Sequence, residues 1–513
     1  MSAPTHAAVP VDSVAAADLA TLHALGYPQQ LHRRMGRFGA FAVPLSTTSV
    51  LTGVPAMFAF AMLVGGPAPL VWSWIVLGPL VLVVAYAMAE ICSAYPASGA
   101  LYYWSDKLAV KHKKLASWVT AWLNGLGQVA GTAGATFSMA LFTGAFLNFK
   151  WNVTVTPGLT FSIFLALLVA CALLNSLAVR LVMRLNEVSV IVHVAGVAVI
   201  ALCLALIPAH HQTARFVTGA VVNDTGFGHT WYVWLLAPLT LMYTMTGIDA
   251  PGHMSEETEN ATFNAPNAMV KSVLSTWALG FVLILALLFA IQPGKYSSEA
   301  GGSFGVAPAS IMVDALPASV ATLLIAWLLV GQFFCVVACL TATSRQFYGA
   351  GRDAVYPGGR WLHSTSRRTR VPVKAVWVAV VLMALIGLPA YLVSVTFFLA
   401  ITSVASAALF LSYIIPVYLR LKAGRAFTPG EYKIPAPRVF AALAVLYVVA
   451  AAVLACLPLS FPVTRADFNW APVMIAIALV GVLAWFALGG RRTYTGPRRY
   501  TAEQIEAIEA EVF

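Results

Sequence analysis

Two short stretches place helix-breaking residues inside strongly apolar runs. Residues 46–55 read STTSVLTGVP, and residues 241–256 read LMYTMTGIDAPGHMSE. Each contains Thr-Gly, then a β-branched residue, then a proline, at 52–55 and at 246–251. An interrupted helix leaves free N–H groups at one half-helix end and free C=O groups at the other, which suit a carboxylate and an ammonium. The matched pair therefore predicts a backbone site for a small zwitterion, and ordinary Gly/Pro kinking is the alternative.

Two ionisable side chains lie where hydrocarbon is expected. His193 sits in the middle of EVSVIVHVAGVAVIALCL, and such a residue is a functional candidate because its burial in a membrane is costly. An imidazole gains and loses a proton near neutral pH, so His193 is a candidate coupling group; a neutral histidine bonded to a carbonyl is the alternative. Asp249 lies in the second interruption, where we expect it to cap the following half-helix rather than to bind a proton or cation.

Other polar and small residues are spaced to face these stretches. Asn124 and Gln128 are four residues apart on one helix face, so we expect both to point inward, either to touch substrate or to satisfy the broken backbone. Gly127 and Gly131 predict close helix approach. Tyr243 lies one turn before the second interruption, where it either closes over a ligand or packs as an interfacial aromatic.

Charged residues at the span ends have structural roles in this interpretation. We expect Glu90 to pair with a loop arginine or with backbone. His253, Glu256 and Glu257 are predicted at the inner mouth, as solvated groups or as ion pairs that form a gate.

Cysteines and motifs give no sign of enzyme chemistry. The six cysteines lie within apolar spans, where we interpret them as small packing residues. Cys335 and Cys339 share a helix face, but no histidine or carboxylate joins them at metal-ligand spacing. The sequence has no GxSxG, HExxH or Walker motif. We therefore expect a protein that is not an enzyme, with no metal and no cofactor.

Composition places these residues in a membrane protein. The 513 residues are 60% hydrophobic and 10% charged, whereas soluble globular proteins carry about 25% charged residues. Apolar runs of ~18–25 residues recur. We predict an all-α fold with twelve transmembrane helices, of which the third and eighth are long, at residues 40–64, 70–92, 118–147, 158–178, 187–207, 231–256, 268–291, 319–344, 375–391, 396–419, 439–459 and 470–488.

The basic residues orient these spans. With the N-terminus inside, only Lys150, Arg215, Lys295 and Arg465 of the 30 lysines and arginines fall outside. The positive-inside rule and the even span number therefore predict an integral cell-membrane protein with both termini cytoplasmic. This bias and the anionic lipid head groups account for the net charge of +11, and no nucleic-acid partner is expected because the basic residues lie at span ends.

Seven segments carry a family resemblance: LHALGYPQQLHRRMGRFGAFAV, SVLTGVPAMFAFAMLVGGP, AEICSAYPASGALYYW, WVTAWLNGLGQVAG, LNEVSVIVHVAG, TGIDAPGHMSEETENATFNAP and TSRQFYGAGRDAVYP. On these segments the chain resembles the amino acid–polyamine–organocation superfamily of secondary transporters. It is most similar to the amino acid/choline transporter branch, which includes fungal GABA and choline permeases. The resemblance covers the first eight spans by motif and the last four by pattern.

The resemblance implies a leucine-transporter-type fold with a five-plus-five inverted repeat, broken helices one and six, and alternating access. Tyr243 matches an outer aromatic gate, Asp249 matches an acidic residue after the glycine, and His193 stands where some proton-coupled relatives carry a lysine. The family's substrate-gripping backbone corresponds to Ser49, Val50, Leu51, Thr52 and Gly53 with Met245, Thr246, Gly247 and Ile248.

These observations predict a domain plan and a function. We expect a tail at 1–35, a transporter domain at 36–489 (repeats at about 36–210 and 230–425, two further helices at about 438–489) and a tail at 490–513 that is an acidic helix or disordered. The expected substrate is an amino acid or an ω-amino acid such as GABA, carried by symport with H⁺. Choline or polyamine transport, exchange and Na⁺ coupling are alternatives, and a membrane receptor or enzyme is disfavoured.

Overall fold

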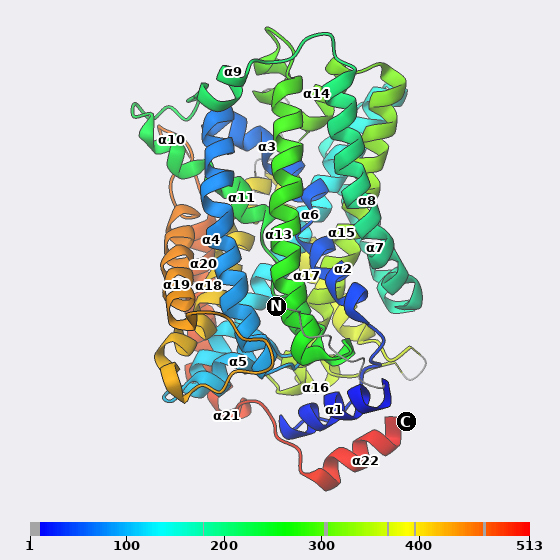
Figure 1. Ribbon diagram of the computed structural model, residues 1–513, viewed down its shortest axis with the longest axis vertical. Helices are drawn as coiled ribbons and strands as arrows, with labels where there is room; N and C mark the ends of the chain where they lie inside the picture. Colours follow the sequence, from blue (N-terminus) through cyan, green and yellow to red (C-terminus); the bar gives the residue numbers. More distant parts are fainter. Residues whose placement is uncertain are drawn as a thin grey trace, which may run out of the picture.

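The computed structural model describes residues 11–177, 179–301, 306–366, 369–393, 397–464 and 468–512 as an all-helical bundle (Figure 1). Arg465, one of the four basic residues predicted on the outer side of the membrane, is not among the described residues. Eleven helical stretches in the described part of the chain are long and apolar enough to span a membrane. The one remaining predicted span, the sixth at residues 231–256, is divided into short helices. The predicted all-α membrane fold is therefore confirmed, and its long third and eighth spans have 39 and 35 residues.

The helices of the bundle are α2 (Arg37–Thr47), α3 (Val50–Val64), α4 (Pro67–Ala94), α6 (Lys113–Trp151), α7 (Pro157–Leu177), α8 (Val179–Leu206), α10 (Trp231–Leu236), α11 (Pro238–Thr244), α12 (Ala250–His253), α13 (Ala261–Ala290), α15 (Ala318–Arg352), α17 (Val373–Leu392), α18 (Phe397–Ala423), α19 (Pro437–Leu454) and α20 (Ala471–Trp485). Shorter elements connect them or form the tails: α1 (Val11–Ala24), α5 (Leu101–Leu108), α9 (Ala214–Gly219), α14 (Ala307–Ala315), α16 (Gly359–Leu362), α21 (Arg491–Thr493), α22 (Ala502–Val512), the 3₁₀ turns η1 (Ser255–Glu257) and η3 (Gly424–Ala426), and the π turns η2 (Ser297–Gly301) and η4 (Phe486–Gly490).

The two ends of the bundle differ. Helices α1 and α22 lie together across one end, which we call the tail side, and α9 and α14 lie at the other, the loop side (Figure 1). The predicted acidic C-terminal helix is α22. It is held to the N-terminal tail because the Glu509 carboxylate accepts a bond from the Gln29 N–H at 2.7 Å and lies 2.8 Å from His23 Nε2.

The first and sixth spans are both interrupted, as predicted. In the first span α2 ends at Thr47 and α3 begins at Val50. The interruption lies within the predicted stretch 46–55, but Thr52 and Gly53, the Thr-Gly pair of that stretch, lie inside α3. At the end of α2 the Pro44 carbonyl oxygen accepts the last helical bond, from the Thr48 N–H, and also bonds from the Thr47 and Thr48 hydroxyls.

In the sixth span the interruption lies between α11 and α12. Gly247 has φ +82°, a left-handed conformation that glycine adopts without a steric penalty, and the helix cannot continue through it. Pro251 then occupies the first turn of α12, where its missing N–H costs no helical bond. Here the predicted Thr-Gly position is correct.

Glycine permits the closest helix contacts. A Cβ on Gly127 of α6 would lie 2.6 Å from Cγ of Leu409 on α18, so only glycine allows these two helices to approach this closely. The prediction for Gly127 is confirmed. Around Gly131 the nearest atom to such a Cβ is 3.8 Å away, which is an ordinary contact. Gly131 instead provides a carbonyl that accepts a bond from Tyr243 at 3.4 Å.

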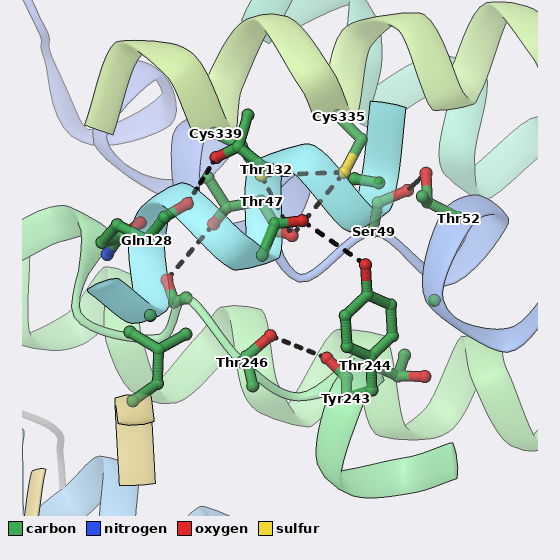
Figure 2. Close-up of a pocket in the computed structure, with 16 residues that line it drawn as sticks. Thr47, Ser49, Thr52, Gln128, Thr132, Tyr243, Thr244, Thr246, Cys335 and Cys339 are labelled. Atoms are coloured by element: carbon green, nitrogen blue, oxygen red, sulfur yellow. Dashed lines mark hydrogen bonds between the residues drawn. The ribbon is translucent and has the colours of Figure 1, made fainter. Parts of the chain in front are cut away.

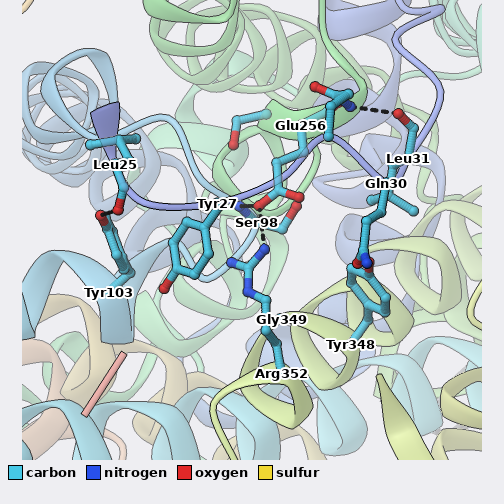
Figure 3. A network of polar contacts seen from close by, with 12 residues as sticks. Leu25, Tyr27, Gln30, Leu31, Ser98, Tyr103, Glu256, Tyr348, Gly349 and Arg352 are labelled. Carbon is cyan, nitrogen blue, oxygen red and sulfur yellow. Dashed lines mark hydrogen bonds and ion pairs between the residues drawn. The ribbon is translucent and has the colours of Figure 1, made fainter. Parts of the chain in front are cut away.

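A polar network closes the tail side (Figure 3). The Glu256 carboxylate accepts bonds from the Ser98 N–H at 3.0 Å and from Arg352 at 3.1 Å. The Arg352 guanidinium also stacks over the Tyr27 ring, 3.5 Å from its centroid. These contacts join the N-terminal tail, η1 and α15 into one buried layer beneath the bundle.

Candidate substrate site

A small cavity lies between the two interruptions at the centre of the bundle (Figure 2). Its volume is about 30 Å³, enough for roughly one or two water molecules. The side chains around it are hydroxyls, thiols, one amide, one phenol and small apolar groups, with no charge among the described residues. The lining residues are Thr47, Ser49, Thr52, Gly53, Gly127, Gln128, Gly131, Thr132, Ala135, Tyr243, Thr244, Thr246, Gly247, Cys335, Cys339 and Leu409.

The two interrupted spans contact each other directly at this cavity. The Thr47 hydroxyl at the end of α2 lies 3.3 Å from the Gly247 carbonyl oxygen and shares its one hydrogen between that oxygen and the nearer Pro44 carbonyl oxygen at 2.9 Å. On the other side of the break, Gly53 of α3 packs against Thr244 of α11 so closely that a Cβ on Gly53 would lie 2.7 Å from the Thr244 Cα. The pair of breaks therefore forms one site.

Helix ends of opposite polarity meet at this site. Ser49 occupies the N-cap position of α3, and its side chain makes no capping bond, so the N–H groups of Val50 and Leu51 have no side-chain cap, while the Thr52 N–H donates to the Ser49 carbonyl oxygen at 3.2 Å. Helices α2 and α11 bring their C-terminal carbonyl groups to the same place. An N-terminal end attracts an anion and a C-terminal end attracts a cation, so the arrangement suits a zwitterion.

Asp249 is the acidic group nearest to the break, and it holds a polar cluster together. One carboxylate oxygen accepts from Asn124 at 2.7 Å and from Gln128 at 3.1 Å and lies 3.1 Å from His253 Nε2. The other accepts from the Tyr413 hydroxyl at 2.9 Å. The predicted cap is therefore wrong: Asp249 stands at the N-cap position of α12, but its side chain makes no capping bond.

This cluster positions the broken backbone. Tyr413, on α18, also accepts a bond from the Gly247 N–H at 3.1 Å, so it links Asp249 to the interruption. Asn124 and Gln128 do point inward, but their amides bind Asp249, and only Gln128 also lines the cavity. A fully buried carboxylate with this many donors is already satisfied.

His193 lies behind the first break and is fully buried. Its Nδ1 is 2.8 Å from the Ser189 carbonyl oxygen, which can only accept, so Nδ1 carries a hydrogen. Its Nε2 is 2.6 Å from the Ser49 hydroxyl, which in turn lies 2.9 Å from the Thr52 hydroxyl. In neutral His193, Nε2 therefore accepts from Ser49, at the cavity wall.

The structure brings seven of the predicted backbone and gate residues to the cavity: Ser49, Thr52, Gly53, Gln128, Tyr243, Thr246 and Gly247. Tyr243 points its hydroxyl across the cavity toward α6 (Figure 2). The side chains of the other predicted residues are buried away from the cavity: Val50, Leu51, Asn124, Met245 and Ile248. Apart from Asn124, these residues were predicted through their backbone groups.

Sequence reasoning missed several residues around the site. Thr132 bonds to Thr343 at 3.2 Å across the α6–α15 contact, and nothing in the local pattern singles it out. Cys335 and Cys339 were interpreted as packing residues, but their sulfurs, 3.9 Å apart, line the cavity and face the Thr47 carbonyl at 3.8 Å. Their four-residue spacing next to a broken helix was the available signal.

The acidic residues near the span ends form ion pairs. Glu257 accepts two bonds from Arg345 of α15, at 2.7 and 3.3 Å. Glu90 accepts two bonds from Arg420, both at 2.9 Å. Glu90 therefore has the expected structural role, although its partner is on α18 rather than in a loop, and Glu257 is paired rather than solvated.

A membrane bundle whose first and sixth spans break around one central cavity has the arrangement expected, from the family resemblance, of a secondary transporter. Comparison with known proteins places the chain within this class. A family model described as amino acid permease matches residues 36–480, and the chain belongs to that family. Proteins of this family are permeases rather than enzymes.

Three relatives show the range of the likeness. The chain is 33% identical to an Arabidopsis thaliana amino-acid permease, covering 93% of this chain and 95% of the relative. It is 31% identical to a homologue of that permease from Oryza sativa subsp. japonica, covering 93% and 95%. It is also 25% identical to a putative polyamine transporter from Candida albicans, covering 96% and 91%.

Proposed function

We propose that the protein carries an amino acid or an ω-amino acid such as GABA across the cell membrane by alternating access, in symport with H⁺. The observation that carries this proposal is an uncharged cavity bounded by the N-terminus of α3 and the C-termini of α2 and α11. A zwitterion presents one carboxylate and one ammonium to these ends and needs no charged side chain.

The cavity favours a zwitterion over a polyamine or choline. A polyamine needs carboxylates, and the nearest one, Asp249, is already bound by four side chains. Choline is typically held by a cage of aromatic rings, and Tyr243 is the single aromatic residue among those that line the cavity. Because one relative is named as a putative polyamine transporter, amines belong in any substrate panel.

His193 is the proposed coupling group. A proton arriving at Nε2 would turn this atom from an acceptor into a donor, so the Ser49 hydroxyl would have to accept from it and donate elsewhere. The Thr52 hydroxyl, 2.9 Å away, is a ready acceptor. Protonation would therefore rearrange bonds across the break between α2 and α3, where the substrate is proposed to bind.

The closed cavity indicates how the cycle would run. A volume of about 30 Å³ cannot hold an amino acid, so the two repeats must separate to load the site. We propose that residues 36–210 and 230–425 move relative to each other, and that the tail side faces the cytoplasm. The ion pairs Glu256–Arg352 and Glu257–Arg345 would then close the inner path in this state.

Thermal-shift screening of the purified protein against amino acids, GABA, choline and polyamines tests the substrate class. The best amino acid is then supplied to proteoliposomes with an inward proton gradient, with a Na⁺ gradient, or with internal substrate only. In the proteoliposomes we expect accumulation only when the proton gradient is present. In the thermal-shift screen, stabilisation by amines and by no amino acid would contradict the proposal.

Two histidine variants test the coupling. His193→Ala should lose proton-driven accumulation, whereas His210→Ala, which changes an exposed histidine near the loop side, should keep it. Accumulation by His193→Ala that retains its dependence on the proton gradient would remove His193 from the mechanism. Uptake that requires substrate inside the proteoliposomes and does not change with the proton gradient would identify an exchanger.

A further inference from the structure

A second, larger cavity opens on the tail side of the bundle, and it shares no lining residue with the charge-free site. Its volume is about 610 Å³, and it lies between the segment before α2, the corner between α7 and α8, the end of α15 and the segment before α17. We call it the arginine cavity, and it is lined by His32, Arg34, Leu177, Arg180, Leu181, Met183, Glu257, Arg345, Thr369, Arg370 and Val371.

Positive charge exceeds negative charge around the arginine cavity. Its one carboxylate, Glu257, is bound to Arg345 at 2.7 and 3.3 Å, so these two charges compensate each other. Neither Arg34 nor Arg180 forms an ion pair with another residue that the structure describes. Guanidinium groups converging on one cavity suit a phosphate, whose oxygens accept their paired N–H donors.

His32 lies in the same positive environment. Burial lowers the pKa of His32, and the guanidinium groups of Arg34 and Arg370 lower it further. The backbone that carries Arg34 is fixed, because the N–H groups of Arg34 and Met35 both donate to the Glu257 carbonyl oxygen at 3.0 Å. The arginine is therefore held at the cavity rather than presented on a loose tail.

The rim of the arginine cavity is apolar on the side of α7 and α8. Leu177 is 72% exposed and Leu181 is 46% exposed. Val188 and Ile191 are further exposed apolar side chains of α8, on the edge of the bundle (Figure 1), and the exposed Arg184 and Glu187 lie between them and Leu181. A cationic cavity with an exposed apolar rim matches a ligand with a charged head and a long hydrocarbon chain.

We infer that the arginine cavity binds the phosphate head group of an anionic phospholipid, with an acyl chain lying along α8. Inorganic phosphate shares the anion chemistry, but it leaves the exposed leucines without a partner. With the tail side facing the cytoplasm, as proposed above, the lipid belongs to the inner leaflet, where basic pockets between helices recruit such head groups. One bound head group would join segments from both repeats on the tail side.

Lipid binding is measured on the full-length protein in detergent, through the thermal shift caused by added phosphatidylglycerol, phosphatidylcholine or inorganic phosphate. The test variant combines Arg34→Gln, Arg180→Gln and Arg370→Gln. The control combines Arg425→Gln, Lys433→Gln and Arg438→Gln, which removes the same charge from exposed positions outside the cavity. Single Arg180→Gln serves as well, since this exposed residue at the start of α8 can change without loss of the fold.

We expect phosphatidylglycerol to stabilise the parent and the control, and phosphatidylcholine and inorganic phosphate to stabilise neither. The apparent affinity for phosphatidylglycerol should fall at least about tenfold in the triple variant and roughly fivefold in Arg180→Gln. Equal loss in the control, or stabilisation by inorganic phosphate alone, would overturn the lipid site. The lipid site would also be overturned if the cavity variants kept the thermal shift caused by phosphatidylglycerol and changed only the KM of transport. That result would make the cavity part of the substrate's exit path. Because this readout needs no transport, it stands or fails separately from the proposed function.

Discussion

The contact between Gly53 and Thr244 permits the sharpest mutational test of the site. In Gly53→Ala the new Cβ would lie 2.7 Å from both Cα and Oγ1 of Thr244 and 2.8 Å from its Cβ. Carbon atoms in contact ordinarily stand about 3.5–4.0 Å apart. Helices α3 and α11 must therefore separate by roughly 1 Å, and the closed cavity must deform with them.

The size of the effect follows from this overlap. Overpacking of a tight contact costs about 1–3 kcal/mol. If this cost falls on the substrate-bound form, with α3 and α11 still in contact, the affinity drops about 5- to 150-fold, at roughly 1.4 kcal/mol per factor of ten. Gly481→Ala in α20 is the control, because no atom lies within 4 Å of its new Cβ while the gain in helix propensity is similar.

The assay is binding of a radiolabelled amino acid, chosen from the thermal-shift panel, to purified parent, Gly53→Ala and Gly481→Ala proteins. Membrane insertion and monodispersity are checked for each. We expect weaker binding in Gly53→Ala alone. Parent-like affinity in Gly53→Ala would mean that the two breaks need not meet closely to hold the substrate, and the reasoning would be refuted.

Three further predictions follow from single features. Gly247→Val should insert normally and lose at least about tenfold in binding, because a β-branched residue resists the φ of +82°; normal uptake would contradict this. Methanethiosulfonate reagents should inhibit uptake by modifying Cys335 and Cys339, which line the cavity. Substrate should protect against this inhibition, and the double Cys→Ser variant should resist it. Inhibition that substrate does not prevent would place the two thiols outside the substrate path. Burial raises the pKa of Glu299 in the loop-side turn η2 to about 7. The folded state therefore binds this proton more tightly, and stability should fall as the pH rises from about 5 to about 7, a slope that Glu299→Gln should flatten; an identical slope in both proteins would exclude Glu299 as its cause.

Much of the fold could be predicted because hydrocarbon imposes simple rules. Span positions follow from apolar runs, and the second interruption follows from Gly247 because its positive φ is a local property of the chain. The first interruption lies in the predicted stretch, but Gly53, which looks like a helix breaker in the sequence, lies inside α3. In the structure it is needed for close approach to Thr244, which depends on a segment far away in the chain.

The site could be predicted only in part for the same reason. Asp249 was expected to cap α12, whereas tertiary packing brings it donors from α6 and α18 that no local pattern reveals. Tyr413 and Thr132 were missed because each is placed at the site by a hydrogen bond to a residue far away in the sequence, Gly247 and Thr343 respectively. His193 could be singled out because its surroundings are uniformly apolar, but its bond to Ser49 required the fold.

The most direct test of the account is a cryo-EM structure of the protein with its best amino acid bound. We predict density between α2–α3 and α11–α12, with the carboxylate at the first turn of α3 and the ammonium at the carbonyl groups that end α11. Ligand density elsewhere in the bundle, with both breaks unoccupied, would contradict the claim that the two interrupted helices together form the substrate site.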